Sequence, residues 1–204
     1  MAQSNERKLF RSNHPQDWYV FLEKSGRNND PQKVFTFEGN ILHASGEDFG
    51  YLVTNKRYRD FHLTLEFKWG ENKYPPRENQ KSDAGILYLV DFYNGDKIWP
   101  RSVEFQIQEG HCGDFWMTDS TTIVFQNSRN IPEPWHREIK FLGAEKPYGE
   151  WNKVEVIVKD GMITHKINGK IVNEGSAPSV KEGNILLQSE GSELFYRNVT
   201  IEAL

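Results

Sequence analysis

The chain has 204 residues, of which 37% are hydrophobic and 26% charged, and its formal net charge is -4. Its 25 lysines and arginines are scattered, so we expect no concentrated positive surface of the kind that binds nucleic acid. No apolar run reaches the roughly 18 residues of a membrane span. This length suits one domain with a proper hydrophobic core.

The amino-terminal residues 1–17 are polar and predict a loosely held lead-in, with a single domain over residues 18–204. We expect no signal peptide in the sequence as given, because no basic segment followed by an apolar one opens it, and Ala2-Gln3-Ser4-Asn5 is typical of the start that remains after cleavage of one. We therefore expect a periplasmic or secreted protein. The single Cys112 excludes an internal disulfide and does not decide the compartment.

Short apolar segments separated by turn residues predict strands through the first half of the chain. In residues 61–67 apolar and polar side chains alternate strictly, as in a strand with one buried face. Residues 84–90 form a nearly continuous apolar run and predict a central strand. Further strands are predicted at residues 18–22, 34–37, 41–44, 51–54 and 121–125.

Two long stretches, residues 69–82 and 127–150, contain prolines among polar residues and predict exposed loops. Near the first of them, Lys81 and Asp83 are expected at the surface. The last third predicts a meander, with a tight hairpin at Asn168-Gly169. About a dozen short strands without helical periodicity indicate an all-β fold, a jelly-roll sandwich of two antiparallel sheets.

The strand over residues 102–108 carries the most informative pattern. Its apolar side chains, Val103, Phe105 and Ile107, are expected in the core, and those between them on the opposite face. That opposite face holds one carboxylate and two amides, which are Glu104, Gln106 and Gln108. Acids, a histidine and glycines follow the strand. Such a face suits a sugar-binding or glycoside-cleaving cleft, although a hydrated outer face would show the same pattern.

The residues around this strand supply further candidates. Glu109, His111 and Asp114 follow it and offer acids, bases or metal ligands, or plain turn residues. Arg101, Gln188 and Glu190 are candidates for sugar contacts. Trp99 and Trp116 offer aromatic faces for a pyranose ring, or core packing. Trp151 is expected in the core, and His165 as a hydrogen-bonded sheet residue.

Several short motifs occur in an order that resembles the 3-keto-disaccharide hydrolase domain family. The resemblance covers roughly residues 35–204, and the motifs are Phe61 to Phe67, Ser82 to Tyr88, Glu104 to Ile107, Gly149 to Asn152, Ile167 to Gly169, Leu187 to Gly191 and Phe195 to Ile201. It implies a concanavalin A-like jelly roll, as in lectins and β-glucanases, and cleavage of glycosides oxidised at carbon 3. One position departs from the family pattern, because Leu89 stands where an arginine often ends the Gly-Ile strand.

Glu104, Gln106 and Glu109 also resemble the Glu-x-Asp-x-x-Glu spacing of the jelly-roll β-glucanases, with glutamine in the middle place. A retaining hydrolase needs its two carboxyl groups about 5–5.5 Å apart. Five residues of flat strand span about 16 Å and place the two glutamates on opposite faces. Ordinary retaining hydrolysis is therefore the weaker enzymatic option.

A 3-keto sugar permits elimination, because the ketone acidifies the hydrogen on carbon 2. We expect Glu104 to be the base, with Glu109, His111 or Asp114 as acid or metal ligand. Gln106 and Arg101 are expected to hold sugar hydroxyls or the enolate oxygen, and a divalent metal ion is a further option for that role. The alternatives are a non-catalytic carbohydrate-binding domain and, less favoured, a partner-binding sandwich without sugar.

Overall fold

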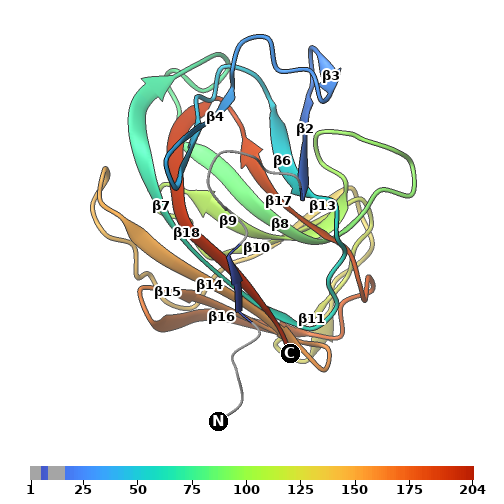
Figure 1. The fold of residues 1–204 in the computed structure, drawn as a ribbon. Helices are drawn as coiled ribbons and strands as arrows, with labels where there is room; N and C mark the ends of the chain where they lie inside the picture. Colours follow the sequence, from blue (N-terminus) through green and yellow to red (C-terminus); the bar gives the residue numbers. More distant parts are fainter. Residues whose placement is uncertain (1–5, 9–16) are drawn as a thin grey trace.

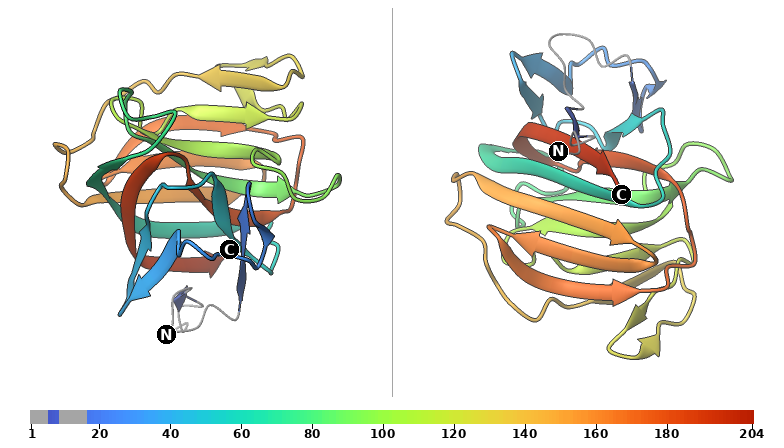
Figure 2. Two further views of the ribbon diagram at one scale, coloured as in Figure 1. Left: turned by 90° about the horizontal axis from the view of Figure 1, so that it is seen from above. Right: turned by 60° about the horizontal axis from the view of Figure 1, so that its bottom comes forward.

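Two antiparallel sheets lie face to face in this computed structural model, which describes residues 6–8 and 17–204 (Figure 1). The right-hand view of Figure 2 shows the layers, with the orange strands of one sheet in front of the green strands of the other. All regular secondary structure in the described residues is strand. None of the described segments is a helix that could cross a membrane.

The larger sheet has ten strands, and consecutive strands in its order are hydrogen-bonded. β1 (Glu6–Lys8) pairs with β18 and lies off the main path. The path runs through β12 (Ser128–Arg129), β11 (Val124–Phe125), β16 (Lys170–Ser176), β15 (Met162–Ile167), β14 (Asn152–Lys159), β7 (Phe61–Lys73), β18 (Ser192–Ala203), β5 (Ile41–Ala44) and β4 (Phe35–Glu38).

The smaller sheet has eight strands and carries the candidate site. Its order is β13 (Trp135–Glu138), β10 (Phe115–Thr118), β9 (Arg101–Gln108), β8 (Asp83–Asp91), β17 (Asn184–Ser189), β6 (Gly50–Thr54), β2 (Trp18–Leu22) and β3 (Gly26–Arg27).

The core fills the space between the sheets, and period-two alternation decides which side chains enter it. Val103, Phe105 and Ile107 of β9 are fully buried there, as predicted. His165 of β15 is buried among them, where its ring pairs with the Tyr88 hydroxyl (2.8 Å) and the Gly113 carbonyl (3.1 Å). Burial lowers the pKa of His165 to about 3, so the ring is neutral, and the prediction of a hydrogen-bonded sheet residue is confirmed.

A second, smaller apolar cluster lies on the other face of the eight-stranded sheet and holds the loop between β8 and β9. The hydroxyls of Tyr19 and Tyr51 both donate hydrogen bonds to Asp96 in that loop, at 2.7 and 3.0 Å. This anchor fixes the loop whose end presents Trp99 beside β9.

The predicted all-β jelly roll is confirmed, and so are the central strand β8 and the hairpin at Asn168-Gly169. Both hairpin residues have positive φ angles, 50° and 79°, which a tight type I′ turn requires. The predicted lead-in over residues 1–17 lies outside the described residues, apart from β1 and Asp17.

Several local predictions were wrong. β7 continues to Lys73, so the first long loop covers only residues 74–82, and the second contains β12 and β13. The predicted strand over residues 121–125 is reduced to β11, while β10 was not predicted because four residues are too few to show a period. Trp151 is half-buried rather than in the core, with the Arg197 guanidinium 3.9 Å from its ring centroid.

Candidate active site

A cleft of about 380 Å³ opens on the outer face of the eight-stranded sheet, over β8, β9 and β10. Polar and aromatic side chains from widely separated parts of the chain converge in it. They are Arg77, Asp83, Trp99, Glu104, Gln106, Gln108, Trp116, Thr118, Trp135 and Glu190.

Strand register explains why the polar side chains share one face. Along β8 and β9, Asp83 lies opposite Gln108 and Gly85 opposite Gln106. On the other side of β9, Trp116 of β10 lies opposite Glu104. Directly paired residues point to the same face of a sheet, so the amides, the carboxylates and the indole all face the cleft.

Asp83 is held by one cation and two amides, and it is 4% exposed. Gln106 and Gln108 donate hydrogen bonds to its two carboxylate oxygens, at 3.1 and 2.7 Å. The Arg77 guanidinium lies 2.8 Å from it. Burial raises the pKa of Asp83, while Arg77 and the amide donors act in the opposite direction. The prediction that Asp83 lies at the surface was therefore wrong.

Arg77 bridges Asp83 to a second carboxylate, that of Glu190, which follows β17. Its guanidinium lies 2.5 Å from Glu190, and Trp99 also acts to lower the pKa of this carboxyl group. Burial and the nearby charge of Asp83 raise the pKa of Glu190 to about 7. Gly191 leaves room for Arg77, because a Cβ at Gly191 would lie 2.6 Å from the Arg77 Cγ.

Glu104 is the third carboxyl group of the cleft, and it is 5% exposed. Burial, followed by the charges of Glu190 and Asp83, raises its pKa well above the usual range. Its side chain lies over Gly85, since a Cβ there would be 1.9 Å from Glu104 Oε1 and 2.5 Å from Gln188 Oε1. Gln188 Oε1 is buried without a hydrogen-bond partner, so a neutral, protonated Glu104 suits this position.

Three tryptophans form the apolar walls. Trp99 comes from the β8–β9 loop, Trp116 from β10 and Trp135 from β13. The Arg137 guanidinium lies 5.8 Å from the Trp116 ring centroid. Indole faces beside carboxylates and amides suit a ligand with both C–H faces and hydroxyl groups.

Eleven site residues were predicted from the sequence. Six of them line this cleft, and a seventh, Gln188, lies against Glu104. The six are Trp99, Glu104, Gln106, Gln108, Trp116 and Glu190. Arg101, Glu109, His111 and Asp114 do not line it.

The residues outside the cleft have other contacts. Asp114 is fully buried, and it accepts hydrogen bonds from Arg137 and from the Lys140 backbone amide (2.9 Å). Arg137 also contacts His111 at 2.7 Å. Burial, Arg137 and Lys81 lower the pKa of His111. These contacts give Asp114 a structural part, since it orients the arginine beside Trp116.

The two remaining candidates lie at opposite ends of β9. Glu109 is 3.4 Å from the Ser82 amide and does not pair with Glu104. Arg101 lies over the Tyr93 ring at 5.9 Å. The carboxyl groups of Glu104 and Glu109 do not form a pair in this structure. The catalytic roles predicted for Glu104 and Glu109 remain predictions.

The sequence analysis did not place Arg77, Asp83, Thr118 or Trp135 in the site. For Asp83 a signal existed, because it is two residues before Gly85 and so lies on the non-core face of β8. Arg77 lies in a long loop, and only folding brings it to the cleft. Leu89 stands where the family pattern often has an arginine at the end of this strand, and it is fully buried in the core. The Arg77 guanidinium therefore supplies a cation that β8 does not.

Arg77 also bears on the suggested metal ion. The guanidinium lies between Asp83 and Glu190, where a cation bound by these two carboxylates would lie. Among the described residues, no group of three or more His, Cys, Asp or Glu side chains is arranged to hold a metal. These side chains therefore do not fit a metal centre, and the metal remains a prediction.

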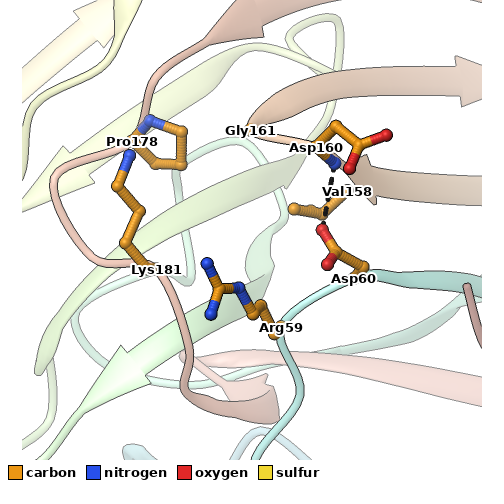
Figure 3. Close-up of a pocket in the computed structure, with 7 residues that line it drawn as sticks. All are labelled: Arg59, Asp60, Val158, Asp160, Gly161, Pro178 and Lys181. Carbon is orange, nitrogen blue, oxygen red and sulfur yellow. Dashed lines mark hydrogen bonds between the residues drawn. The ribbon is translucent and has the colours of Figure 1, made fainter.

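A separate pocket of about 220 Å³ lies where the turns before β7 and after β14 meet the β16–β17 loop (Figure 3). It is lined by two cations, Arg59 and Lys181, and two acids, Asp60 and Asp160. Asp60 accepts a hydrogen bond of 3.0 Å from the Asp160 amide. No aromatic side chain lines it, so the tryptophan-walled cleft is the better candidate for a sugar.

Comparison with known families supports the resemblance inferred from the motifs. The family model of the 3-keto-alpha-glucoside-1,2-lyase-like domain matches residues 6–202. No protein with a curated description matches the chain.

Solved structures share the fold. A protein from Parabacteroides distasonis, provisionally described as a glycosyl hydrolase, superposes with a TM-score of 0.70 at 18% identity, covering 98% of this chain and 94% of its own. The β-glucanase of Bacillus licheniformis gives 0.60 at 9%, covering 100% and 99%. The carbohydrate-binding module CBM66 of Bacillus subtilis gives 0.56 at 7%, covering 98% and 96%. Enzymes and a binding module thus share this architecture.

Proposed function

Because the chain belongs to the 3-keto-alpha-glucoside-1,2-lyase-like family, we propose that it cleaves 3-keto-glycosides in the cleft of the eight-stranded sheet. One observation carries the proposal. Three buried carboxyl groups, those of Asp83, Glu104 and Glu190, converge around one arginine between tryptophan walls. Buried carboxyl groups are costly, and carboxyl groups with strongly perturbed pKa values cluster at catalytic sites.

The reaction proposed is an elimination followed by hydration. A base removes the proton from carbon 2, which the neighbouring ketone acidifies, and an enolate forms. The bond between carbon 1 and the glycosidic oxygen then breaks, and an acid protonates the departing oxygen. Water adds across the carbon 1–carbon 2 double bond, so the products are a free 3-keto sugar and the leaving alcohol.

Glu190 is the proposed base. A general base works best when its pKa lies near the working pH. Burial beside Asp83 raises the pKa of Glu190 to about 7. Its hydrogen bond from Arg77 holds the carboxylate in place without eliminating its basicity.

Glu104 is the proposed acid. Its pKa is raised well above the usual range, so it carries a proton that it can donate to the departing oxygen. This exchanges the role expected from the sequence, in which Glu104 is the base. Two carboxyl groups whose surroundings give them different protonation states can divide acid and base work.

Arg77 is proposed to stabilise the enolate. Negative charge develops on the ketone oxygen as the proton leaves carbon 2, and a preorganised cation lowers the energy of that state. Asp83, with Gln106 and Gln108, fixes the position of the guanidinium.

The roles of the two glutamates can be separated by the leaving group. We expect Glu104→Gln and Glu190→Gln each to lower the turnover of a 3-keto-glucoside about 10²–10⁴-fold. With nitrophenyl 3-keto-glucoside, whose leaving group needs no protonation, Glu104→Gln should recover most of its loss and Glu190→Gln should not. The exposed Glu150→Gln is the matched control. Recovery in Glu190→Gln alone would reverse the roles, and undiminished turnover in both variants would refute the mechanism.

The second candidate function is carbohydrate binding without catalysis. It is favoured by the three tryptophans and the paired amides Gln106 and Gln108, which would suffice to hold a sugar. Saturable binding of 3-keto and unoxidised sugars, with no turnover of either, would establish it.

A further inference from the structure

We propose that the cleft has an anion subsite at one end, formed by Lys81, His111 and Arg137, which binds a carboxylate or sulfate group carried by a sugar. The inference deepens the proposed function, because it makes glycosides with an acidic group the preferred ligands of the cleft. It rests on that function for the reaction alone, since the same subsite serves a protein that binds acidic sugars without cleaving them.

The first two side chains lie where the paired strands β8 and β9 end. Asp83 and Gln108 lie opposite each other there, and both line the cleft. Lys81 comes two residues before Asp83 in the chain, and His111 comes three residues after Gln108. The Lys81 Nζ lies 3.2 Å from the His111 Nε2, so the two side chains meet directly beyond the lining of the cleft.

The Arg137 side chain reaches the same place from β13. Its guanidinium lies 2.7 Å from the His111 Nδ1 and 5.8 Å from the ring centroid of Trp116, an indole that lines the cleft. Two of its nitrogen atoms donate hydrogen bonds to the buried Asp114, which fixes the guanidinium in this position. The three side chains therefore form one cluster that adjoins the wall of the cleft.

The contacts of His111 place a donor at each of its ring nitrogens. Arginine only donates hydrogen bonds, so Nδ1 must accept the one from Arg137. A neutral imidazole that accepts at Nδ1 carries its proton at Nε2, and this N–H faces the Lys81 ammonium, which also only donates. Two donors thus face each other, and an oxygen atom that accepts from both would replace this contact with two hydrogen bonds.

Positive charge prevails around this histidine. Burial lowers the pKa of His111, and so do the charges of Arg137, Lys81 and Lys140, while Asp114 acts in the opposite direction. The Asp114 carboxylate is already engaged, because it accepts hydrogen bonds from Arg137 and from the Lys140 backbone amide. Among the described residues, no acid lies within ion-pair distance of Lys81. An anionic group on a ligand supplies both the counter-charge and the acceptor.

Two acids of the neighbouring loops are engaged elsewhere. Glu145 pairs with Lys140 at 3.7 Å and accepts a hydrogen bond of 3.4 Å from the Gly110 amide. Glu109 lies 3.4 Å from the Ser82 amide. Neither of them is positioned to take the place of the ligand anion between Lys81 and His111.

The adjoining cleft explains why the anion should be part of a sugar. Trp116 and Gln108 line the cleft beside the cluster, and they suit the C–H face and the hydroxyl groups of a pyranose ring. A uronic acid or a sulfated sugar joins such a ring to an anionic group within a few bonds. One ligand can thus occupy the cleft and the cluster together, and binding at one place favours binding at the other.

The test measures binding and does not depend on turnover. Methyl α-glucuronide, methyl α-glucoside 6-sulfate, methyl α-glucoside and inorganic sulfate are each titrated into the purified protein by calorimetry. We expect both acidic sugars to bind at least about tenfold more tightly than methyl α-glucoside, and Lys81→Gln to remove this preference. Lys170→Gln, which changes an exposed lysine on the ten-stranded sheet, is the matched control and should keep it.

A second readout reports on His111 directly. An anion beside the ring favours its charged form, so methyl α-glucuronide should raise the pKa of His111, whereas methyl α-glucoside should not. An NMR titration of the ring signals measures this pKa, and the spectrum of His111→Gln identifies which signals belong to the residue.

Equal affinity for acidic and neutral sugars, no binding of the acidic sugars, or a preference that survives in Lys81→Gln would refute the subsite. Inorganic sulfate that binds as tightly as the sulfated sugar would also overturn it, because the anion site would then be independent of the cleft. Failure of the proposed function has a different signature. The acidic preference would persist, and no 3-keto-glycoside, acidic or neutral, would be cleaved.

Discussion

At the scale of single residues, the cleft is defined by an imbalance of charge. Asp83, Glu104 and Glu190 are each less than a tenth exposed, and Arg77 is the cation among them. One guanidinium cannot neutralise three carboxylates, so at least one proton must remain in the cleft. Glu104, next to the unpaired Gln188 oxygen, is best placed to hold it.

The pH dependence of the reaction follows from Glu190. A base acts when deprotonated, and burial raises the pKa of this carboxyl to about 7, so kcat/KM should fall as the pH drops below about 7. Arg77 lowers the pKa of Glu190, so Arg77→Gln should move this limb to higher pH. A pH–rate profile of both proteins measures the shift. An acid limb near pH 4, or one that Arg77→Gln does not move, would show that Glu190 is not the base.

At the scale of strands, the alternation in β9 predicted which side chains face the core and which face the cleft. The positions of Glu104 and Gln106 on the cleft face follow from that pattern without knowledge of the partner strands. Other site residues do not, because their positions depend on neighbours. Trp116 lies in a four-residue strand, and Trp135 in another, too short for a period to be visible in the sequence.

Gly85 gives the central strand β8 a testable part in the site. A Cβ at this position would lie 1.9 Å from Glu104 Oε1, the far end of a flexible side chain. We therefore expect Gly85→Ala to keep the fold but move the Glu104 carboxyl, lowering turnover at least about tenfold with little change in the melting temperature. Gly143→Ala, whose Cβ would meet no atom within 4 Å, is the control. Full activity in Gly85→Ala would show that the position of Glu104 is unimportant.

At the scale of the whole molecule, the jelly roll was predictable from strand periodicity, turn residues and the order of the family motifs. The convergence of the site was not. Arg77 lies in the loop after β7 and Glu190 beyond β17, and 112 residues of chain separate them. The Tyr74 amide donates a hydrogen bond to the Gly191 carbonyl (2.8 Å), which holds the loop over the strand end. No local pattern encodes such a pairing.

The fold alone does not distinguish an enzyme from a binding module, since β-glucanase and CBM66 both share it. We propose that the buried carboxyl groups make this chain an enzyme, and one assay tests what they do. The purified protein is incubated with 3-keto-trehalose and, separately, with trehalose, each with and without EDTA. We predict release of 3-keto-glucose from the oxidised sugar alone, undiminished by EDTA because Arg77 supplies the positive charge. Cleavage of trehalose, or binding of 3-keto-trehalose without any cleavage, would contradict elimination in this cleft.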